Sequence, residues 1–219
     1  MNRISNRLSP RRQLVTAAIL ASVLVPGAVR ARTNQALQSA VSPGREHPHV
    51  EINTHVPFNV TGALTIEAWV RLKGYAAGEF PPKWQALVAK GESWGLTRYS
   101  NTDRLAFRTT ADGTMHTLAT NPTTALTAGE WTHVAAVWDG TSKSIYINGE
   151  LDVTEAWAGP PDSNGFDVLI GGNEEAPSRV FEGSLDDIRV WHTARTSAAL
   201  QSTMRRRLRG SEPGLLGYW

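Results

Sequence analysis

Acidic residues that lie close together are the first candidates for chemistry in this sequence of 219 residues. Hydrolysis of a glycosidic bond needs two carboxyl groups that flank the bond on one face of the protein. Glu150 and Asp152 are two positions apart and Glu155 follows them, but the first two border an expected hairpin turn. Asp186 and Asp187 are adjacent, so in a strand they point to opposite faces of the sheet. Neither pair predicts a catalytic site.

Nucleophilic and zinc chemistry have equally little support. The sequence has 0 Cys, which excludes disulfides, thiolate metal sites and cysteine nucleophiles. No Ser-His-Asp arrangement or Gly-x-Ser-x-Gly motif stands out. His47, His49, Glu51 and His55 are closely spaced, and the first two would share one side of an extended chain. Because no further metal ligand has a defined spacing, we interpret the three histidines as exposed loop residues.

Tryptophan is in excess, with 8 residues, and an indole ring can provide a large contact area for a sugar. Trp84, Trp94 and Trp157 lie at loops or strand ends beside Pro or Gly, and we predict that they form an exposed ligand-binding rim. The alternative is that these rings are buried and only fasten their loops. The other five lie within strand patterns and are predicted to be core residues: Trp69, Trp131, Trp138, Trp191 and Trp219.

Four arginines cluster near the C-terminus. Arg205, Arg206, Arg207 and Arg209 could bind an anionic polymer, such as a sulfated glycan or a phosphate surface. The simpler interpretation is a charged helix end, because cations are favoured in the last turn of a helix.

Residues 1–31 have the layout of a secretory signal peptide. Several arginines precede a short apolar run and a small-residue cleavage site that ends at Ala31. The apolar run is too short to span a bilayer, so we expect export and no membrane span. The pair Arg11-Arg12 is also similar to the twin-arginine export pattern. Residues 32–48 are polar and without periodicity, and they are predicted to be a linker.

Export changes the charge of the protein. The whole chain has Lys+Arg 22 and Asp+Glu 20, a formal net charge of +2. Residues 1–31 contain five arginines and no acid, so their removal leaves 17 basic against 20 acidic residues, a net charge of −3. A nucleic-acid partner is therefore not expected.

Most of the chain after residue 49 alternates between short apolar runs and turn residues. In the segment 64–72 every second residue is apolar, which is typical of a half-buried strand. Asn148-Gly149 between two such runs predicts a hairpin, because both central residues of the tight turn need a positive φ. The predicted strands are 64–72, 85–89, 94–99, 104–109, 114–120, 131–138, 143–147, 150–157, 166–170, 184–191 and 215–219.

One segment alone has the spacing of a helix. Leu200, Met204 and Leu208 are four residues apart within 197–208, and Thr196 or Ser197 can cap its start. About ten short strands with regular turns predict an antiparallel sandwich or barrel. The lack of helices between the strands argues against a parallel sheet.

Five segments carry motifs that occur together in one family. They are Leu64–Val70, Glu130–Ala135, Lys143–Gly149, Gly183–Trp191 and Gly214–Trp219. Their order resembles the laminin-G-like jelly-roll family, which is related to the pentraxins and legume lectins. The resemblance covers about 49–219 and implies an all-β, two-sheet antiparallel jelly-roll sandwich of the concanavalin A-like class, with one short C-terminal helix. It does not imply one function, because sites are grafted onto folds.

The resemblance bears on calcium and on catalysis. Many relatives bind Ca²⁺, and the place that matches the pentraxin calcium loop supplies oxygens from Asn173, Glu174 and Glu175. A solvated acidic turn is the alternative. Many relatives carry a further Asp or Asn before the first strand, where this chain has Ser42-Pro43-Gly44, so that ligand is missing. Glycan-cleaving relatives carry Glu-x-Asp-x-x-Glu on one strand; Glu150, Asp152 and Glu155 have this spacing here, but they start at the expected hairpin turn.

We therefore predict an exported, non-catalytic recognition module that binds a carbohydrate or a cell-surface protein, with Ca²⁺ as an optional aid. The first alternative is a protein–protein adhesion or scaffold module that uses a sheet face or edge. The second is a glycan-cleaving enzyme with an unorthodox carboxylate pair.

Overall fold

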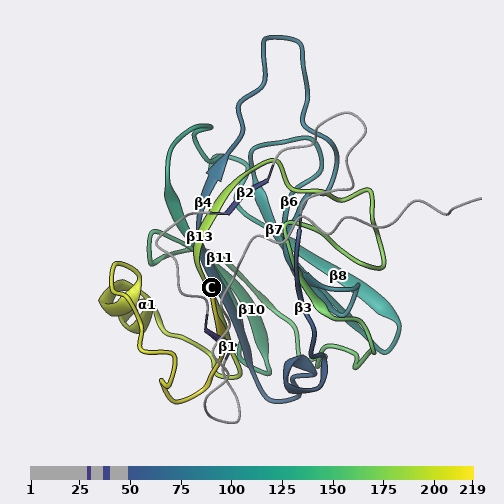
Figure 1. Cartoon of the computed structure of the whole chain (residues 1–219), viewed down its shortest axis with the longest axis vertical. Helices are drawn as coiled ribbons and strands as arrows, with labels where there is room; N and C mark the ends of the chain where they lie inside the picture. Colours follow the sequence, from purple (N-terminus) through teal and green to yellow (C-terminus); the bar gives the residue numbers. More distant parts are fainter. Residues whose placement is uncertain (1–28, 31–36, 40–48) are drawn as a thin grey trace, which may run out of the picture.

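The computed structural model describes residues 29–30, 37–39 and 49–219, and its strands form two sheets packed face to face (Figure 1). The eight-stranded sheet contains β1 (Val29–Arg30), β14 (Leu215–Tyr218), β13 (Gly183–Trp191), β4 (Leu64–Leu72), β9 (Thr132–Trp138), β10 (Ser142–Ile147) and β11 (Glu150–Ala156) in this order, with β2 (Leu37–Ser39) also paired to β13. The six-stranded sheet has the order β3 (Val50–Ile52), β12 (Val168–Ile170), β5 (Ala86–Lys90), β6 (Trp94–Arg98), β7 (Leu105–Ala111) and β8 (Thr114–Ala119). The predicted antiparallel sandwich is confirmed.

The core lies between the two sheets and follows the alternation in the sequence. Leu64, Ile66 and Val70 of β4 are fully buried in it. From the opposite sheet, cross-strand neighbours such as Leu96 and Phe107 close the core. Successive side chains of a strand point to opposite faces, so an alternating strand buries one apolar row in such a layer.

The predicted strands agree with the observed ones to within two residues at each end. The short strands β1, β2 and β3 were not predicted; β1 and β2 fall in the segments interpreted as signal peptide and linker, and β3 lies at the start of the domain. The rest of those two segments lies outside the described residues, so both interpretations remain predictions. No helix in the described part of the chain is long and apolar enough to cross a bilayer.

Strand β13 departs from strict alternation. Its pairing with β4 shifts between Asp186 and Arg189, and Asp187 has a φ of 47°. An extra residue of this kind exchanges the faces of the side chains on either side of it. Leu185 therefore points into the core, whereas Trp191 points outward and donates a hydrogen bond from Nε1 to Glu67 Oε1 (2.8 Å). Strict alternation would place Leu185 and Trp191 on one face; the extra residue separates them, and Asp187 contacts Arg189 on the outer face.

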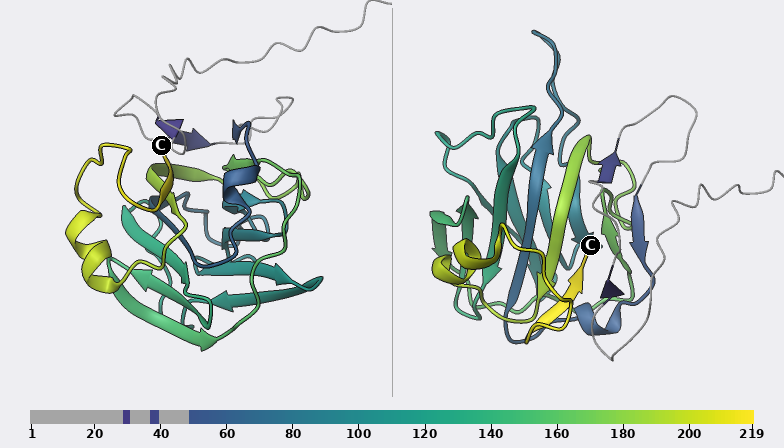
Figure 2. Two further views of the ribbon diagram at one scale, coloured as in Figure 1. Left: turned by 90° about the horizontal axis from the view of Figure 1, so that it is seen from below. Right: turned by 60° about the vertical axis from the view of Figure 1, so that its left-hand side comes forward.

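Helix α1 (Ser197–Thr203) is shorter than predicted and lies on the outer face of the eight-stranded sheet (Figures 1 and 2). Thr196 caps its start, as expected, by accepting a hydrogen bond from Ala199 N. Its end is held by the sheet, because Arg189 donates to Thr203 O (3.1 Å) and Trp69 Nε1 donates to Met204 O (2.8 Å). The carbonyls at the helix end are thus satisfied by side chains of β13 and β4.

Candidate functional site

The outer face of the six-stranded sheet lies on the opposite side of the sandwich from α1 (Figure 2). Cross-strand neighbours Ala89, Gly95, Arg108 and Thr117 form one row across this sheet. The adjacent row, which contains Phe107, points into the core, so this row points outward. Ala89, Gly95 and Thr117 are small, so the long side chain of Arg108 has space above the sheet for the groups that it contacts.

Arg108 is the centre of a contact network on this face. Its Nη2 lies 3.0 Å from Glu92 Oε2, and its guanidinium carbon lies 5.1 Å from the centroid of the Trp84 ring. The same nitrogen contacts the sulfur of Met115, and Arg179 pairs with the other oxygen of Glu92. We call these five residues the Arg108 platform; they come from β7, β8, the β5–β6 turn and the segments before β5 and β13.

The platform carries two guanidinium groups for one carboxylate. The side chain of Arg108 is 11% exposed, and its Nε is buried without a hydrogen-bond partner. Burial lowers the pKa of Arg108, against the opposing charge of Glu92, but an arginine stays protonated at neutral pH. Two guanidinium groups have more N–H donors than one carboxylate accepts, so their exposed donors can bind a hydroxyl or carboxylate oxygen of a ligand.

Trp84 is held on the platform in a strained backbone conformation. Its φ is 60°, which is rare for a bulky residue, and Ser100 beside it has a φ of 51°. The two are joined by a hydrogen bond from Trp84 N to Ser100 O (3.2 Å), and the Trp84 ring meets Tyr99 edge to face at 5.1 Å. Such strain persists only where the surroundings enforce it, and it is common at binding sites.

The three tryptophans of the predicted rim do not lie together. Trp84 is partly exposed on the platform, as a binding role requires. Trp94 is 1% exposed, packs in the core and donates from Nε1 to Phe58 O (3.0 Å), so its assignment to an exposed rim is wrong. Trp157 is half-buried. It follows β11, the edge strand of the eight-stranded sheet, and its ring stacks on His116 of β8 with the centroids 4.1 Å apart. The alternative of a buried fastening ring therefore holds for Trp94.

The predicted core tryptophans also divide. Trp138 and Trp191 are both 1% exposed, but only Trp138 belongs to the core between the sheets; Trp191 packs with Leu208, Leu215 and Tyr218 on the outer face. Trp69 and Trp219 are only partly buried. Trp131 is 39% exposed, because it precedes β9 and its ring lies under the Arg71 guanidinium instead of between the sheets.

The residues of the predicted calcium loop form hydrogen bonds within their own region. Asn173 is buried, and its Oδ1 accepts from the backbone N of Glu175 (2.9 Å) and Ala176 (3.1 Å). Glu175 accepts from Glu92 N (2.8 Å), and Glu174 accepts from Asp167 N (3.2 Å). In the described ranges, no group of three or more His, Asp and Glu side chains is placed to hold a metal ion. Calcium binding by the exposed Glu174 and Glu175 remains a prediction.

The carboxylates considered for catalysis have structural contacts. Asp152 accepts from Asn121 N (2.8 Å) and Thr124 Oγ1 (2.5 Å), which fastens the loop after β8 to β11. Asp187 accepts from the hydroxyl of Tyr218. Glu155, on the same strand as Asp152, lies 3.5 Å from His116 Nε2, so both of these β11 acids have structural partners.

Most of the platform was not identified from the sequence. Glu92, Arg108, Met115 and Arg179 are far apart along the chain and belong to no motif. The available signal was the position of Arg108, the single charged side chain of its strand. Alternation indicates that it faces outward, but not what it contacts there.

Solved structures with the same fold belong to several kinds of binding protein. A Bacteroides ovatus protein, provisionally assigned as carbohydrate-binding, is 21% identical, with a TM-score of 0.58 over 85% of this chain and 49% of its own. The CBM40 domain of a Ruminococcus gnavus sialidase is 17% identical, with a TM-score of 0.58 over 78% of this chain and 99% of its own. A heptameric SAP-like pentraxin from Limulus polyphemus is 16% identical, with a TM-score of 0.55 over 83% and 84%. This chain thus spans about half of the Bacteroides protein, and these similarities concern the fold.

The family follows from a match that covers most of the chain. No curated protein sequence matches it. Residues 44–201 match the Laminin_G_3 family, described as the concanavalin A-like lectin/glucanases superfamily. The chain belongs to this family, as its sequence motifs predicted.

Proposed function

We propose that this chain is an exported, non-catalytic module that binds carbohydrate on the Arg108 platform. The observation that carries the proposal is the contact of an indole ring, a guanidinium and a carboxylate on the sheet face opposite α1. Sugars offer an apolar C–H face for an aromatic ring and hydroxyl groups for charged hydrogen-bonding side chains. Trp84, Arg108 and Glu92 provide both kinds of contact at one place.

The platform is organised before a ligand arrives. The Trp84 ring is fixed between Tyr99 and Arg108, and Arg108 is held in turn by Glu92. A site that is already ordered loses less conformational entropy on binding. This favours recognition by a rigid surface over a role that depends on loop closure.

Two of the similar structures contain a bound sugar. The Ruminococcus gnavus CBM40 domain was solved with α2,3-sialyllactose, and domain 4 of a Geobacillus stearothermophilus arabinanase was solved with arabinotriose. These are properties of those proteins, and they support carbohydrate as the ligand class to test first.

A glycan array, read with CaCl₂ and with EDTA, tests the proposal directly. We expect binding to at least one glycan, and a loss of at least about tenfold in affinity for Trp84→Ala and for Arg108→Gln. Trp131→Ala is the matched control, because it removes an exposed indole from the other sheet. Silence on every glycan would refute the proposal, and steady release of reducing sugar would refute its non-catalytic part.

Protein recognition is the second candidate, and Phe80 is the observation that favours it. Phe80 is 71% exposed on the loop between β4 and β5, which projects beyond the rest of the sandwich (Figure 1). Exposed aromatic residues are enriched at protein interfaces. Binding of labelled protein to cells that is lost with Phe80→Ala and after protease treatment, but kept by Trp84→Ala, would favour this candidate.

A further inference from the structure

We infer that the turn after α1 is a second binding surface, which recognises an anionic polysaccharide. The turn at 205–209, called here the basic turn, presents Arg205, Arg206, Arg207 and Arg209, all exposed. It lies on the face of the eight-stranded sheet, opposite the Arg108 platform, so the inference is independent of the proposed glycan site.

The basic turn stands out against the charge of the domain. Residues 49–219 contain 15 Lys and Arg against 19 Asp and Glu, a formal net charge of −4. The basic turn alone carries +4 in five residues. A positive patch on a negative domain orients the domain toward an anionic partner.

Most other cations are buried or paired. In the described ranges Lys90, Arg98, Lys143 and Arg189 are buried, while Lys73 and Arg179 pair with acids.

The arginines of the basic turn form no ion pair in the part of the chain that the structure describes. The nearby Glu212 directs its carboxylate to the backbone N of Arg209 (2.6 Å) and Gly210 (2.9 Å). The guanidinium groups therefore remain available to an anion from outside.

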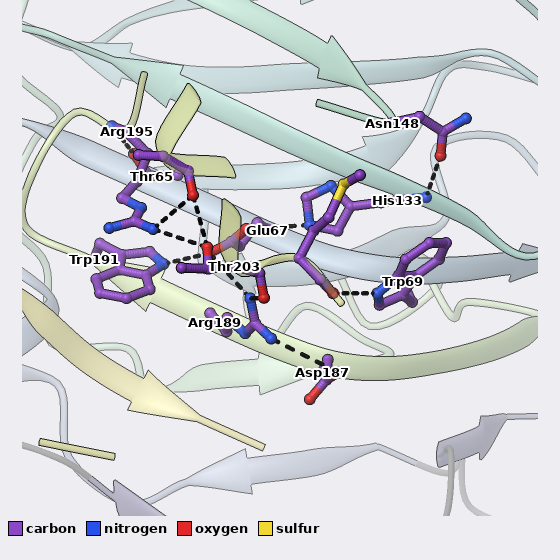
Figure 3. A network of polar contacts seen from close by, with 12 residues as sticks. Thr65, Glu67, Trp69, His133, Asn148, Asp187, Arg189, Trp191, Arg195 and Thr203 are labelled. Carbon is purple, nitrogen blue, oxygen red and sulfur yellow. Dashed lines mark hydrogen bonds and ion pairs between the residues drawn. The ribbon is translucent and has the colours of Figure 1, made fainter. Parts of the chain in front are cut away.

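The basic turn and the two residues before it are held by two side chains of the sheet, Arg189 and Trp69 (Figure 3). Arg189 donates to Thr203 O (3.1 Å) and to Arg206 O (2.7 Å), and Trp69 donates to Met204 O (2.8 Å). The guanidinium of Arg205 also packs over the Trp69 ring at 5.5 Å. The arginines are thus presented from an ordered support, which reduces the entropy lost on binding.

The chemistry of the turn favours a polysaccharide over a lipid surface. A guanidinium binds sulfate or carboxylate through two parallel hydrogen bonds. Binding to a bilayer surface also uses apolar residues that enter the membrane. Here the apolar residues of the segment, Leu200, Met204 and Leu208, are buried against the domain.

Isothermal titration with heparin and with polygalacturonate tests the inference, since one polymer bears sulfates and the other carboxylates. The test variant is Arg206→Gln/Arg207→Gln, which leaves the backbone contacts of the turn in place. The control is Lys73→Gln/Lys83→Gln, which removes the same charge from another exposed region. We expect the test variant to weaken binding about tenfold and the control to change it by less than about twofold.

Salt gives a second measurement that needs no variant. Binding by the wild type should weaken steeply between low and physiological salt, because exposed charges are screened. Three results would overturn the inference: equal losses in both variants, salt-independent binding, or binding to phosphatidylglycerol vesicles without binding to either polymer. Trp84→Ala should weaken glycan binding at the Arg108 platform and leave polymer binding at the basic turn unchanged. Failure of this inference is therefore distinguishable from failure of the proposed function.

Discussion

Lys143 Nζ on β10 lies 3.3 Å from His116 Nδ1 on β8, in the layer between the two sheets. Nζ also donates to Phe107 O (2.8 Å) and to Thr109 Oγ1 (3.1 Å). Burial lowers the pKa of Lys143 to about 7, although the charge of Glu155 opposes this effect. A lysine placed in this way links the stability of the sandwich to pH.

The stability of the wild type should rise with pH between about 7 and 9.5. The unfolded lysine keeps its proton up to a pKa near 10.5, whereas the folded one releases it above about 7, so the unfolded state binds more protons in this range. The slope expected from one such group is about 1 kcal/mol per pH unit. Urea denaturation at several pH values measures it, and Lys143→Met should flatten the profile.

Burial also lowers the pKa of Lys90, to about 8. Comparing the pH profiles of the wild type and Lys143→Met separates the contribution of Lys143 from that of Lys90. Lys83→Met is the control, because Lys83 is exposed and its removal should leave the profile unchanged. An identical slope in wild type and Lys143→Met would show that Lys143 does not carry the effect.

Glu67→Gln should destabilise the eight-stranded sheet. Glu67 is buried, accepts from Trp191 Nε1 (2.8 Å), and lies 3.1 Å from His133 Nε2 and 3.7 Å from Arg189 Nη1. Removal of its charge leaves the buried Arg189 with Asp187 (3.7 Å) as its remaining carboxylate and weakens the contacts with His133 and Trp191, which costs about 2 kcal/mol. Urea denaturation at pH 7 measures the loss, with the exposed Glu150→Gln as the control.

The same variant has a defined acid response. Burial tends to raise the pKa of Glu67, but the hydrogen bond from His133 and the charge of Arg189 outweigh it and lower the pKa below 4.5. Its contribution is therefore present above pH 4.5 and is lost as pH falls below that value. The difference between wild type and Glu67→Gln should shrink in acid; a constant difference would contradict the assignment.

Gly149→Ala should loosen α1 from the β10–β11 hairpin. A Cβ at Gly149 would lie 2.5 Å from Gln201 Cγ, and Ser197 Oγ donates to Gly149 O (2.5 Å). Gly113→Ala is the matched control, because Gly113 also has a positive φ, 71° against 80°, but a Cβ there meets nothing within 4 Å. We expect Gly113→Ala to cost about 1 kcal/mol and Gly149→Ala to cost more in thermal melts. Equal costs would mean that the contact with α1 contributes nothing.

Calcium should raise the thermal midpoint if Glu174 and Glu175 bind it. A ligand that binds the folded state alone stabilises it by RT ln(1 + [L]/Kd). The expected result is a rise with millimolar CaCl₂, a smaller one with MgCl₂, and none in Glu174→Gln/Glu175→Gln. A midpoint that does not move in the wild type would remove calcium from the proposed function.

The sequence by itself determined the elements and their class. Every second residue of 64–72 is apolar, and Asn148-Gly149 specifies a tight turn, so these features depend on neighbours along the chain. Strands β4 to β14, the start of α1 and the family followed from such local signals. The end of α1 did not, because Arg189 and Trp69 reach its carbonyls from other strands.

The tertiary structure decided which side chains meet and which face they occupy. Trp84 and Trp94 both lie beside strand ends in the sequence, yet one is on the platform and the other is in the core. The reason is the period of two in a strand: a shift of one residue, as at Asp187, exchanges the faces. Arg108 meets Glu92 and Trp84 only because register and turns bring separate segments together, and no local pattern records those contacts.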